Sequence, residues 1–192
     1  MREAKLEPNE FSYSAGISAC AKGEQWQRAV SLFSEMWKSK LEPNVISYNA
    51  GISSCEKGEQ WQQALSLLRE MREVKLEPDV IFSYNAGTSA CEKGEQWQRA
   101  LSLLSEMRQV NLEPDVTGYN AAISACEKVE EWQRALSLLS DMWKVKLEPD
   151  VISYNAGMSA CEKVDEWPRA LSLLSEMREA KLEPDAISYY SL

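Results

Sequence analysis

A segment of about 35 residues recurs along the whole chain and constrains its fold more than any other feature. The clearest copy is Val45–Asp79, VISYNAGISSCEKGEQWQQALSLLREMREVKLEPD. Full copies occupy residues 10–44, 45–79, 80–115, 116–150 and 151–185, with partial copies at 1–9 and 186–192. The third copy has one extra residue, because it reads VIFSY in place of VISY. A fixed period in this range is typical of a solenoid, in which each unit buries its apolar face against its neighbours.

Each repeat predicts two helices joined by a short turn. In the first predicted helix, at about 100° per residue, one face carries the larger apolar residues. In the second copy these residues are Tyr48, Ile52 and Cys55. The turn at Gly58 precedes a second helix, 60–73, which has a broad apolar stripe and ends before Pro78. Stacked antiparallel helix pairs predict an all-α fold.

Gly51 lies inside the first predicted helix, where glycine costs about 1 kcal/mol relative to alanine. Glycine recurs at this place in three other repeats, and Ala122 replaces it in one. We interpret the position as one where another backbone approaches closely.

Five cysteines occur once per repeat, at Cys20, Cys55, Cys91, Cys126 and Cys161. Disulfide frameworks and zinc sites need cysteines that cluster in space, whereas these lie a whole repeat apart. The chain also has no histidine to complete a metal site. We expect small buried side chains, free thiols suited to a reducing compartment, and neither a metal nor a cofactor.

The net charge of −9 counts against nucleic acid as a ligand, since most nucleic-acid binders are basic. Alternatively, much of the acid lies on helix faces where it pairs with lysine and arginine. No apolar run is long enough to cross a bilayer, so no membrane partner is expected. The chain has no histidine, phosphate loop or metal cluster, and we do not expect an enzyme.

The repeat resembles the pentatricopeptide repeat of the P type. The shared features are the S-Y-N opening, the Cys/Lys region before the turn, A-L-x-L-L, the E-M dipeptide and the closing L-x-P-D. The resemblance implies a right-handed superhelical solenoid of stacked helix-turn-helix hairpins. One departure is that the family usually has glycine near the end of the unit, where this chain has Lys40, Lys75, Asn111, Lys146 and Lys181.

The resemblance also implies binding of single-stranded RNA, one base per repeat, read by two or three side chains. In the family, the base is read by the residue after the opening tyrosine together with the last residue of the unit. These pair here as Ser14 with Asn44, Asn49 with Asp79, Asn85 with Asp115, Asn120 with Asp150, and Asn155 with Asp185. The family's base preferences then imply the target 5′-A-U-U-U-U-3′, running parallel to the protein.

Two further sets of residues follow from the resemblance. Side chains that wedge between bases map to Phe11, Ile46, Ile81, Thr117 and Ile152, with Phe82 as an alternative to Ile81. Lysines near the phosphates map to Lys22, Lys57, Lys93, Lys128 and Lys163. A second interpretation of these lysines is a solvated helix end, where cations are favoured. Glutamates beside most of them would repel phosphate.

Two functions remain open from the sequence. The recurrent polar pair favours sequence-selective RNA binding, in organellar RNA processing, stability or translation by family resemblance. The acidic charge and the lack of a large basic patch favour a scaffold that binds protein partners in the same groove. The chain begins inside a repeat, MREAKLEPN, and shows no transit segment. We interpret it as a fragment of a longer array or a reading frame with a truncated start, and chloroplast or mitochondrion follows from the family alone.

Overall fold

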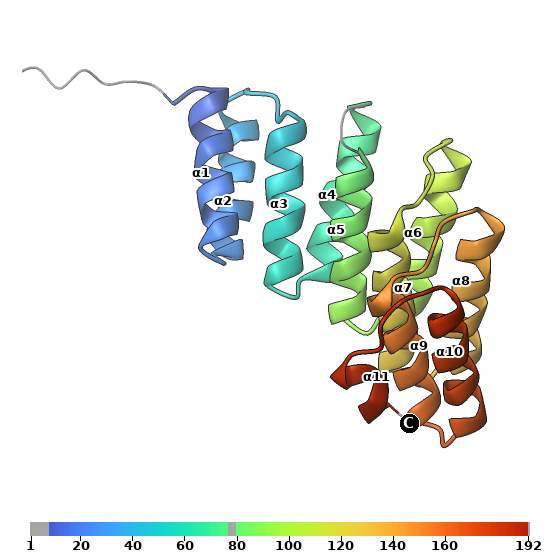
Figure 1. The fold of residues 1–192 in the computed structure, drawn as a ribbon. Helices are drawn as coiled ribbons and strands as arrows, with labels where there is room; N and C mark the ends of the chain where they lie inside the picture. Colours follow the sequence, from blue (N-terminus) through green and yellow to red (C-terminus); the bar gives the residue numbers. More distant parts are fainter. Residues whose placement is uncertain (1–7, 77–79, 192) are drawn as a thin grey trace, which may run out of the picture. The chain divides into compact units, whose positions relative to one another are not determined.

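The computed structural model describes residues 8–76 and 80–191, which are helical and contain no strand (Figure 1). The helices are α1 (Glu10–Lys22), α2 (Trp26–Lys38), α3 (Val45–Lys57), α4 (Trp61–Glu73), α5 (Val80–Lys93), α6 (Trp97–Gln109), α7 (Val116–Lys128), α8 (Trp132–Lys144), α9 (Val151–Glu162), α10 (Trp167–Glu179) and α11 (Ala186–Tyr190). The predicted all-α class is confirmed. Across these two ranges, no helix is long and apolar enough to span a membrane.

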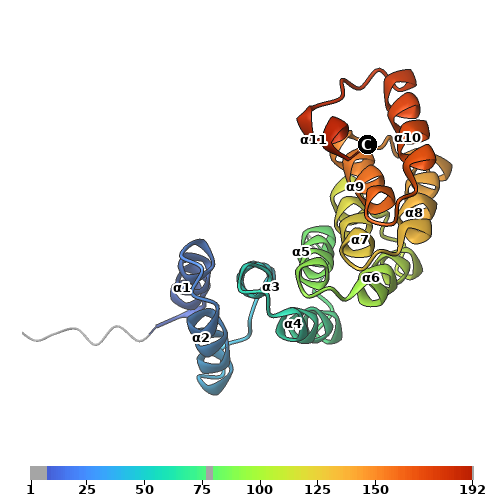
Figure 2. The ribbon, with the colours of Figure 1, turned by 90° about the horizontal axis from the view of Figure 1, so that it is seen from below.

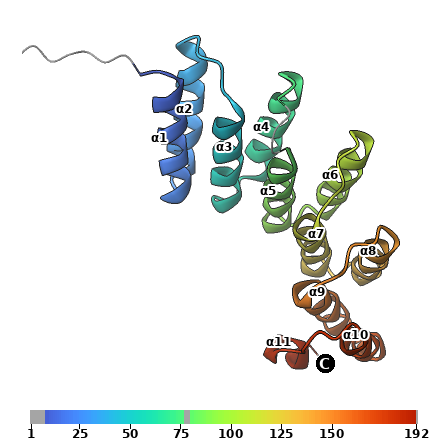
Figure 3. The same cartoon turned by 45° about the horizontal axis from the view of Figure 1, so that its top comes forward.

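The chain forms two compact units, Met1–Ala90 and Cys91–Leu192. We call the odd-numbered helices first helices and the even-numbered helices second helices. In the first unit, α1 lies beside α3, and α2 contacts both. In the second unit, α7 lies beside α9, which also contacts α11. Figures 2 and 3 show the first helices of this second unit in one layer and the second helices in another.

Equivalent positions of successive repeats fill the core. The three residues predicted to share the apolar face of α3 are fully buried: Tyr48, Ile52 and Cys55. Leu68 and Met71 of α4 complete this layer. A tyrosine at the place of Tyr48 is also buried in each of the next three repeats. Burying one large apolar side chain contributes about 1.5–3 kcal/mol, so repeated burial of the same residues stabilises every slab.

The glycine inside the first helix makes room for side chains, and the predicted backbone approach is wrong. A Cβ atom on Gly51 would lie 3.1 Å from Leu67 Cδ1 and 3.7 Å from Phe33 Cδ2. On Gly157 it would lie 2.6 Å from Leu139 Cδ1. The leucines of the second helices therefore occupy the space that a larger residue would fill.

Each second helix is followed by a residue in the left-handed conformation that is not glycine. At the end of α8, Lys146 has φ 59°. Its N–H donates to the Trp143 carbonyl at 3.0 Å, and the Leu147 N–H donates to the Met142 carbonyl at 2.9 Å. These two bonds form a Schellman motif, in which glycine is favoured because it has no Cβ to crowd the backbone.

Replacing Lys146 by glycine is expected to raise the free energy of unfolding by about 1 kcal/mol, because the left-handed conformation costs a residue with a Cβ atom about that much. Lys144→Gly is the matched control. It lies two residues earlier, as the last residue of α8 and paired with Asp141, and should lower the free energy of unfolding by up to about 1 kcal/mol. Urea unfolding measures both. If both substitutions changed the free energy of unfolding in the same direction, this account of the helix end would be contradicted.

Burial controls the chemistry of the thiols. It raises the pKa of Cys55, Cys91 and Cys126 to about 11, from an ordinary value of 9.0. Cys20, in the first repeat, is only half-buried. Because only the thiolate is nucleophilic, the buried thiols should be inert near neutral pH.

With a thiol reagent at pH 8, we expect rapid reaction at Cys20 and reaction of Cys55, Cys91 and Cys126 only after unfolding. Mass spectrometry of the labelled peptides identifies each site. Equal labelling of these four cysteines in the folded protein would contradict the burial.

The raised pKa values of Cys55, Cys91 and Cys126 also make stability depend on pH, because these thiols lose their protons at a lower pH in the unfolded state than in the folded state. Their contribution to stability is complete below about pH 9 and declines towards pH 11.

Candidate functional site

The last residue of a repeat caps the first helix of the next repeat. Four predicted reader residues act in this way: Asn44, Asp115, Asp150 and Asp185. The Asn44 Oδ1 accepts from the Ser47 N–H at 3.0 Å, and the Asp150 Oδ1 accepts from the Ser153 N–H at 2.9 Å. Such caps satisfy backbone donors that the helix leaves unpaired. Asp79 lies outside the described residues.

In the fourth repeat, the predicted pair is in direct contact. Asn120 projects from α7, and its Nδ2 donates to Asp150 Oδ1 at 3.0 Å. Ser153, at the start of α9, donates its hydroxyl to Asn120 Oδ1 at 2.5 Å. The amide is thus held at both ends, and the contacts join two consecutive repeats.

The fifth repeat forms the same arrangement. Asn155 Nδ2 donates to Asp185 Oδ1 at 3.0 Å, and Ser188 Oγ donates to Asn155 Oδ1 at 2.6 Å. The backbone N–H of Ser188 lowers the pKa of the Asp185 carboxyl group, with a further contribution from the Asn155 amide. The carboxylate is therefore kept ionised as an acceptor.

In the first unit, two further serines contact the predicted reader residue of the preceding repeat. Ser83 Oγ donates to Asn49 Oδ1. In the first repeat, where Ser14 replaces asparagine, its hydroxyl lies 2.8 Å from the Ser47 hydroxyl. The predicted pair Asn85 and Asp115 falls in different units, so its role remains a prediction. Sequence reasoning missed this contact of the serine, although a serine before the tyrosine in every full copy except the fourth, which has Gly118, was a visible signal.

Exposed residues adjoin this polar row at the places predicted to wedge between bases. Ile46 and Ile152 are each 61% exposed, and Phe11 and Thr117 are also exposed. In the repeat with the extra residue, counting back from Ser83 puts Phe82 at the place of Ile46. Phe82 is 52% exposed and Ile81 is 37% exposed. The wedging role itself stays a prediction.

The predicted lysine row links neighbouring repeats. Lys128 Nζ lies 3.0 Å from Glu92 Oε1, and Lys163 Nζ lies 3.0 Å from Glu127 Oε1. Each lysine also donates to the backbone carbonyl of the same glutamate. Lys57 similarly donates to the Ala21 carbonyl at 3.2 Å. These contacts favour the helix-end interpretation, because cations stabilise the C-terminal end of a helix.

The remaining two members of the row differ in their surroundings. Lys22 is exposed at the end of α1, and Lys93 is half-buried at the end of α5. A phosphate contact by any lysine of the row stays a prediction.

Lys163→Ala should lower the free energy of unfolding by about 0.5–1 kcal/mol, since it removes a partly exposed ion pair and a bond to a helix end. Lys22→Ala is the matched control, because this lysine is exposed at the end of α1 and should change stability by less than about 0.5 kcal/mol. Urea unfolding of both variants provides the measurement. Equal losses would show that the inter-repeat contact contributes nothing specific.

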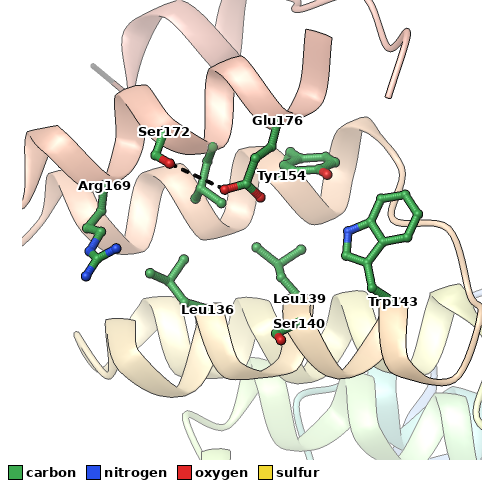
Figure 4. Close-up of a pocket in the computed structure, with 9 residues that line it drawn as sticks. Leu136, Leu139, Ser140, Trp143, Tyr154, Arg169, Ser172 and Glu176 are labelled. Atoms are coloured by element: carbon green, nitrogen blue, oxygen red, sulfur yellow. Dashed lines mark hydrogen bonds between the residues drawn. The ribbon is translucent and has the colours of Figure 1, made fainter. Parts of the chain in front are cut away.

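The second helices present a different hollow, shown in Figure 4. It has a volume of about 280 Å³ and lies between α8 and α10. Its lining includes Leu136, Leu139, Trp143, Tyr154 and Glu176. None of the predicted reader residues lines it. The hollow is therefore a separate surface, in which apolar side chains and a carboxylate lie together.

In two second helices, a residue near the end makes a contact across the repeat boundary close to a buried tyrosine. In α6 this residue is Arg108, whose Cζ lies 5.7 Å from the centre of the Tyr119 ring. In α2 it is Trp37, whose Nε1 donates to Glu70 Oε1 at 2.7 Å. The Tyr48 hydroxyl donates to the same Glu70 oxygen at 3.1 Å. These contacts stabilise the second-helix side of the stack.

Solved structures with a similar fold are pentatricopeptide repeat proteins. The pentatricopeptide repeat protein PPR10 from maize matches with a TM-score of 0.75 and 27% identity, over all of this chain and 27% of the PPR10 chain. The PPR domain of protein-only RNase P 1 from Arabidopsis thaliana, in complex with tRNA, matches with a TM-score of 0.80 and 13% identity, over 94% of both chains. PPR10 in complex with an 18-nt psaJ RNA element matches with a TM-score of 0.71 and 22% identity, over 98% of this chain and 31% of that one.

The chain spans about a quarter of the length of PPR10. The comparison with curated proteins gave no match. Three family models match successive parts of the sequence. They are the pentatricopeptide repeat domain at residues 102–163, the PPR repeat family at 8–57 and 149–192, and the PPR repeat at 46–76 and 82–112. With its helix pairs and its repeating polar contacts, the chain belongs to the pentatricopeptide repeat family.

Proposed function

We propose that this chain binds single-stranded RNA and reads about one base per repeat through the residue after the tyrosine and the last residue of the unit. One observation carries the proposal. The pairs Asn120 with Asp150 and Asn155 with Asp185 have the same contacts in consecutive repeats. A row of equivalent polar pairs suits a ligand that is itself a row of equivalent units.

The chemistry of each pair suits uracil. After Asn120 donates one Nδ2 hydrogen to Asp150 and accepts from Ser153, it retains a second Nδ2 hydrogen and a lone pair on Oδ1. The remaining hydrogen would donate to a uracil carbonyl oxygen. Asp150 would accept from the uracil N–H, directly or through water. Cytosine presents an amino donor where uracil has a carbonyl, and this donor would oppose the amide hydrogen.

The exposed apolar residues supply a second, sequence-tolerant contribution. Ile46 and Ile152 lie two residues before a buried tyrosine and three before a reader asparagine, beside the polar row. Phe11 and Phe82 add aromatic rings. Stacking of a base on an aromatic side chain contributes about 1–3 kcal/mol. Two such contacts, together with the exposed isoleucines, would help to bind an unpaired strand without a basic surface.

Related proteins support the proposal. The similar proteins include PPR10, solved in complex with an RNA element, and a PPR domain solved in complex with tRNA. Family resemblance extends the proposal to non-catalytic roles in organellar RNA processing, stability or translation.

A second candidate is a protein-binding scaffold that uses the second-helix side. The hollow between α8 and α10 favours it, because Trp143 is 47% exposed beside Tyr154 and Glu176. A protein ligand would leave the reader pairs without a role, whereas RNA would use them.

Fluorescence anisotropy with labelled A-U-U-U-U, its C-for-U variants and the matching DNA tests the proposal. We expect about 10-fold weaker binding of an RNA with cytosine at the fourth position, as one lost polar pair costs about 1–3 kcal/mol. Asn120→Ala should abolish this difference at the fourth position. We also expect a shallow dependence on salt, because Lys128 and Lys163 are already paired.

Gln133→Ala is the control, since it removes an exposed amide on α8. Equal affinity for all RNAs, for DNA and for the Asn120 variant would contradict base reading and favour the scaffold. A steep loss of affinity with salt would show that lysines contact phosphates.

A further inference from the structure

A serine that comes just before the tyrosine position of a repeat bonds to the reader asparagine of the preceding repeat, and Gly118 takes this place in the fourth repeat. Ser153 Oγ lies 2.5 Å from Asn120 Oδ1, and Ser188 Oγ lies 2.6 Å from Asn155 Oδ1. Ser83 makes the same contact in the first unit. The contact recurs on three first helices and in both units, so it is a property of the repeats that carry this serine.

These contacts allow only one orientation of the asparagine amide. The aspartate carboxylate can only accept and must meet the amide nitrogen, which leaves the amide oxygen to accept from the serine hydroxyl. In the fourth repeat, a flipped Asn120 would place its oxygen against the Asp150 carboxylate and would replace the acceptor of the Ser153 hydroxyl with a donor. The contact with Asp150 would be lost, and the Ser153 hydroxyl would lose Asn120 as its acceptor.

The serine is held in place by its own surroundings. Ser153 is fully buried, and its Oγ accepts from the Asp150 N–H at 3.1 Å. Its hydroxyl also lies 2.9 Å from Asp150 Oδ1, so the single proton is shared, with the shorter contact made to Asn120. Ser188 has the same set of contacts with Asp185 and Asn155. Because water is excluded from both hydroxyls, it does not compete for the amide oxygen.

We propose that this serine is a positioning residue that sets the base preference of the preceding repeat. It does so by directing the free amide hydrogen and the free lone pair of the asparagine towards the ligand. The inference rests on the proposed function and adds a third determinant, supplied by the following repeat, to the reader pairs of Asn49, Asn120 and Asn155. Selectivity at one nucleotide then depends on two adjacent repeats.

Two reciprocal variants test this role. Ser153→Ala should reduce the preference for uracil over cytosine at the fourth nucleotide about fivefold, the effect of losing one hydrogen bond, and leave the fifth unchanged. Ser188→Ala should reduce the preference at the fifth nucleotide and leave the fourth unchanged. The readout is the ratio of dissociation constants for RNAs that differ at one nucleotide.

Each variant is the folding control for the other, since general destabilisation would weaken binding to every RNA alike. Preferences that stay unchanged, or that fall together at both nucleotides, would overturn the positioning role. If the unaltered protein shows no base preference, the proposed function fails. If the unaltered protein shows the preference and neither serine variant alters it, only the positioning role fails.

A second measurement needs no RNA. Nitrogen-15 relaxation of the side-chain amides in the free protein should show Asn120 and Asn155 as rigid. Ser153→Ala should make the Asn120 amide mobile and leave Asn155 rigid, with the reverse for Ser188→Ala. An Asn120 amide that stays equally rigid in Ser153→Ala would overturn the inference, whatever the RNA affinity.

Discussion

The structure depends on the hydrogen bonds at the boundary between one repeat and the next. The terminal residue of a repeat accepts backbone N–H groups at the start of the following first helix, as Asp150 does with Ser153. The same carboxylate accepts from the amide of its own repeat, Asn120. The residues proposed to read bases are therefore part of the joint that sets the stacking. Their spacing follows the repeat because the helix cap places them.

The positions of two lysines show how part of the chain's charge is used in stacking. Lys128 and Lys163 pair with glutamates of the preceding repeat and with the ends of its first helix. They contribute to stacking, and their positive charges are already paired. An RNA ligand would then be bound mainly by base contacts, and such binding favours selectivity over affinity, since phosphate contacts carry no sequence information.

Much of the fold could be predicted from periodicity. The apolar face with Tyr48, Ile52 and Cys55 is buried as expected, because helical spacing alone places these residues together. Two details of the site could not be predicted. Ser153 lies in a different repeat from Asn120, and only stacking brings them into contact. The neighbours of Gly51 are leucine and phenylalanine side chains from second helices, which the sequence of one helix does not reveal.

The sequence by itself determined the repeat, the two helices of each repeat, the buried face and the family, because all of these depend on local spacing along one chain. Tertiary structure decided which atoms meet across a boundary. It brought Lys163 into an ion pair with Glu127, and the Asn155 amide into hydrogen bonds with Asp185 and Ser188. The physical reason is that these contacts join residues about 30 or more positions apart, whose distance is set by the stacking of one slab on the next.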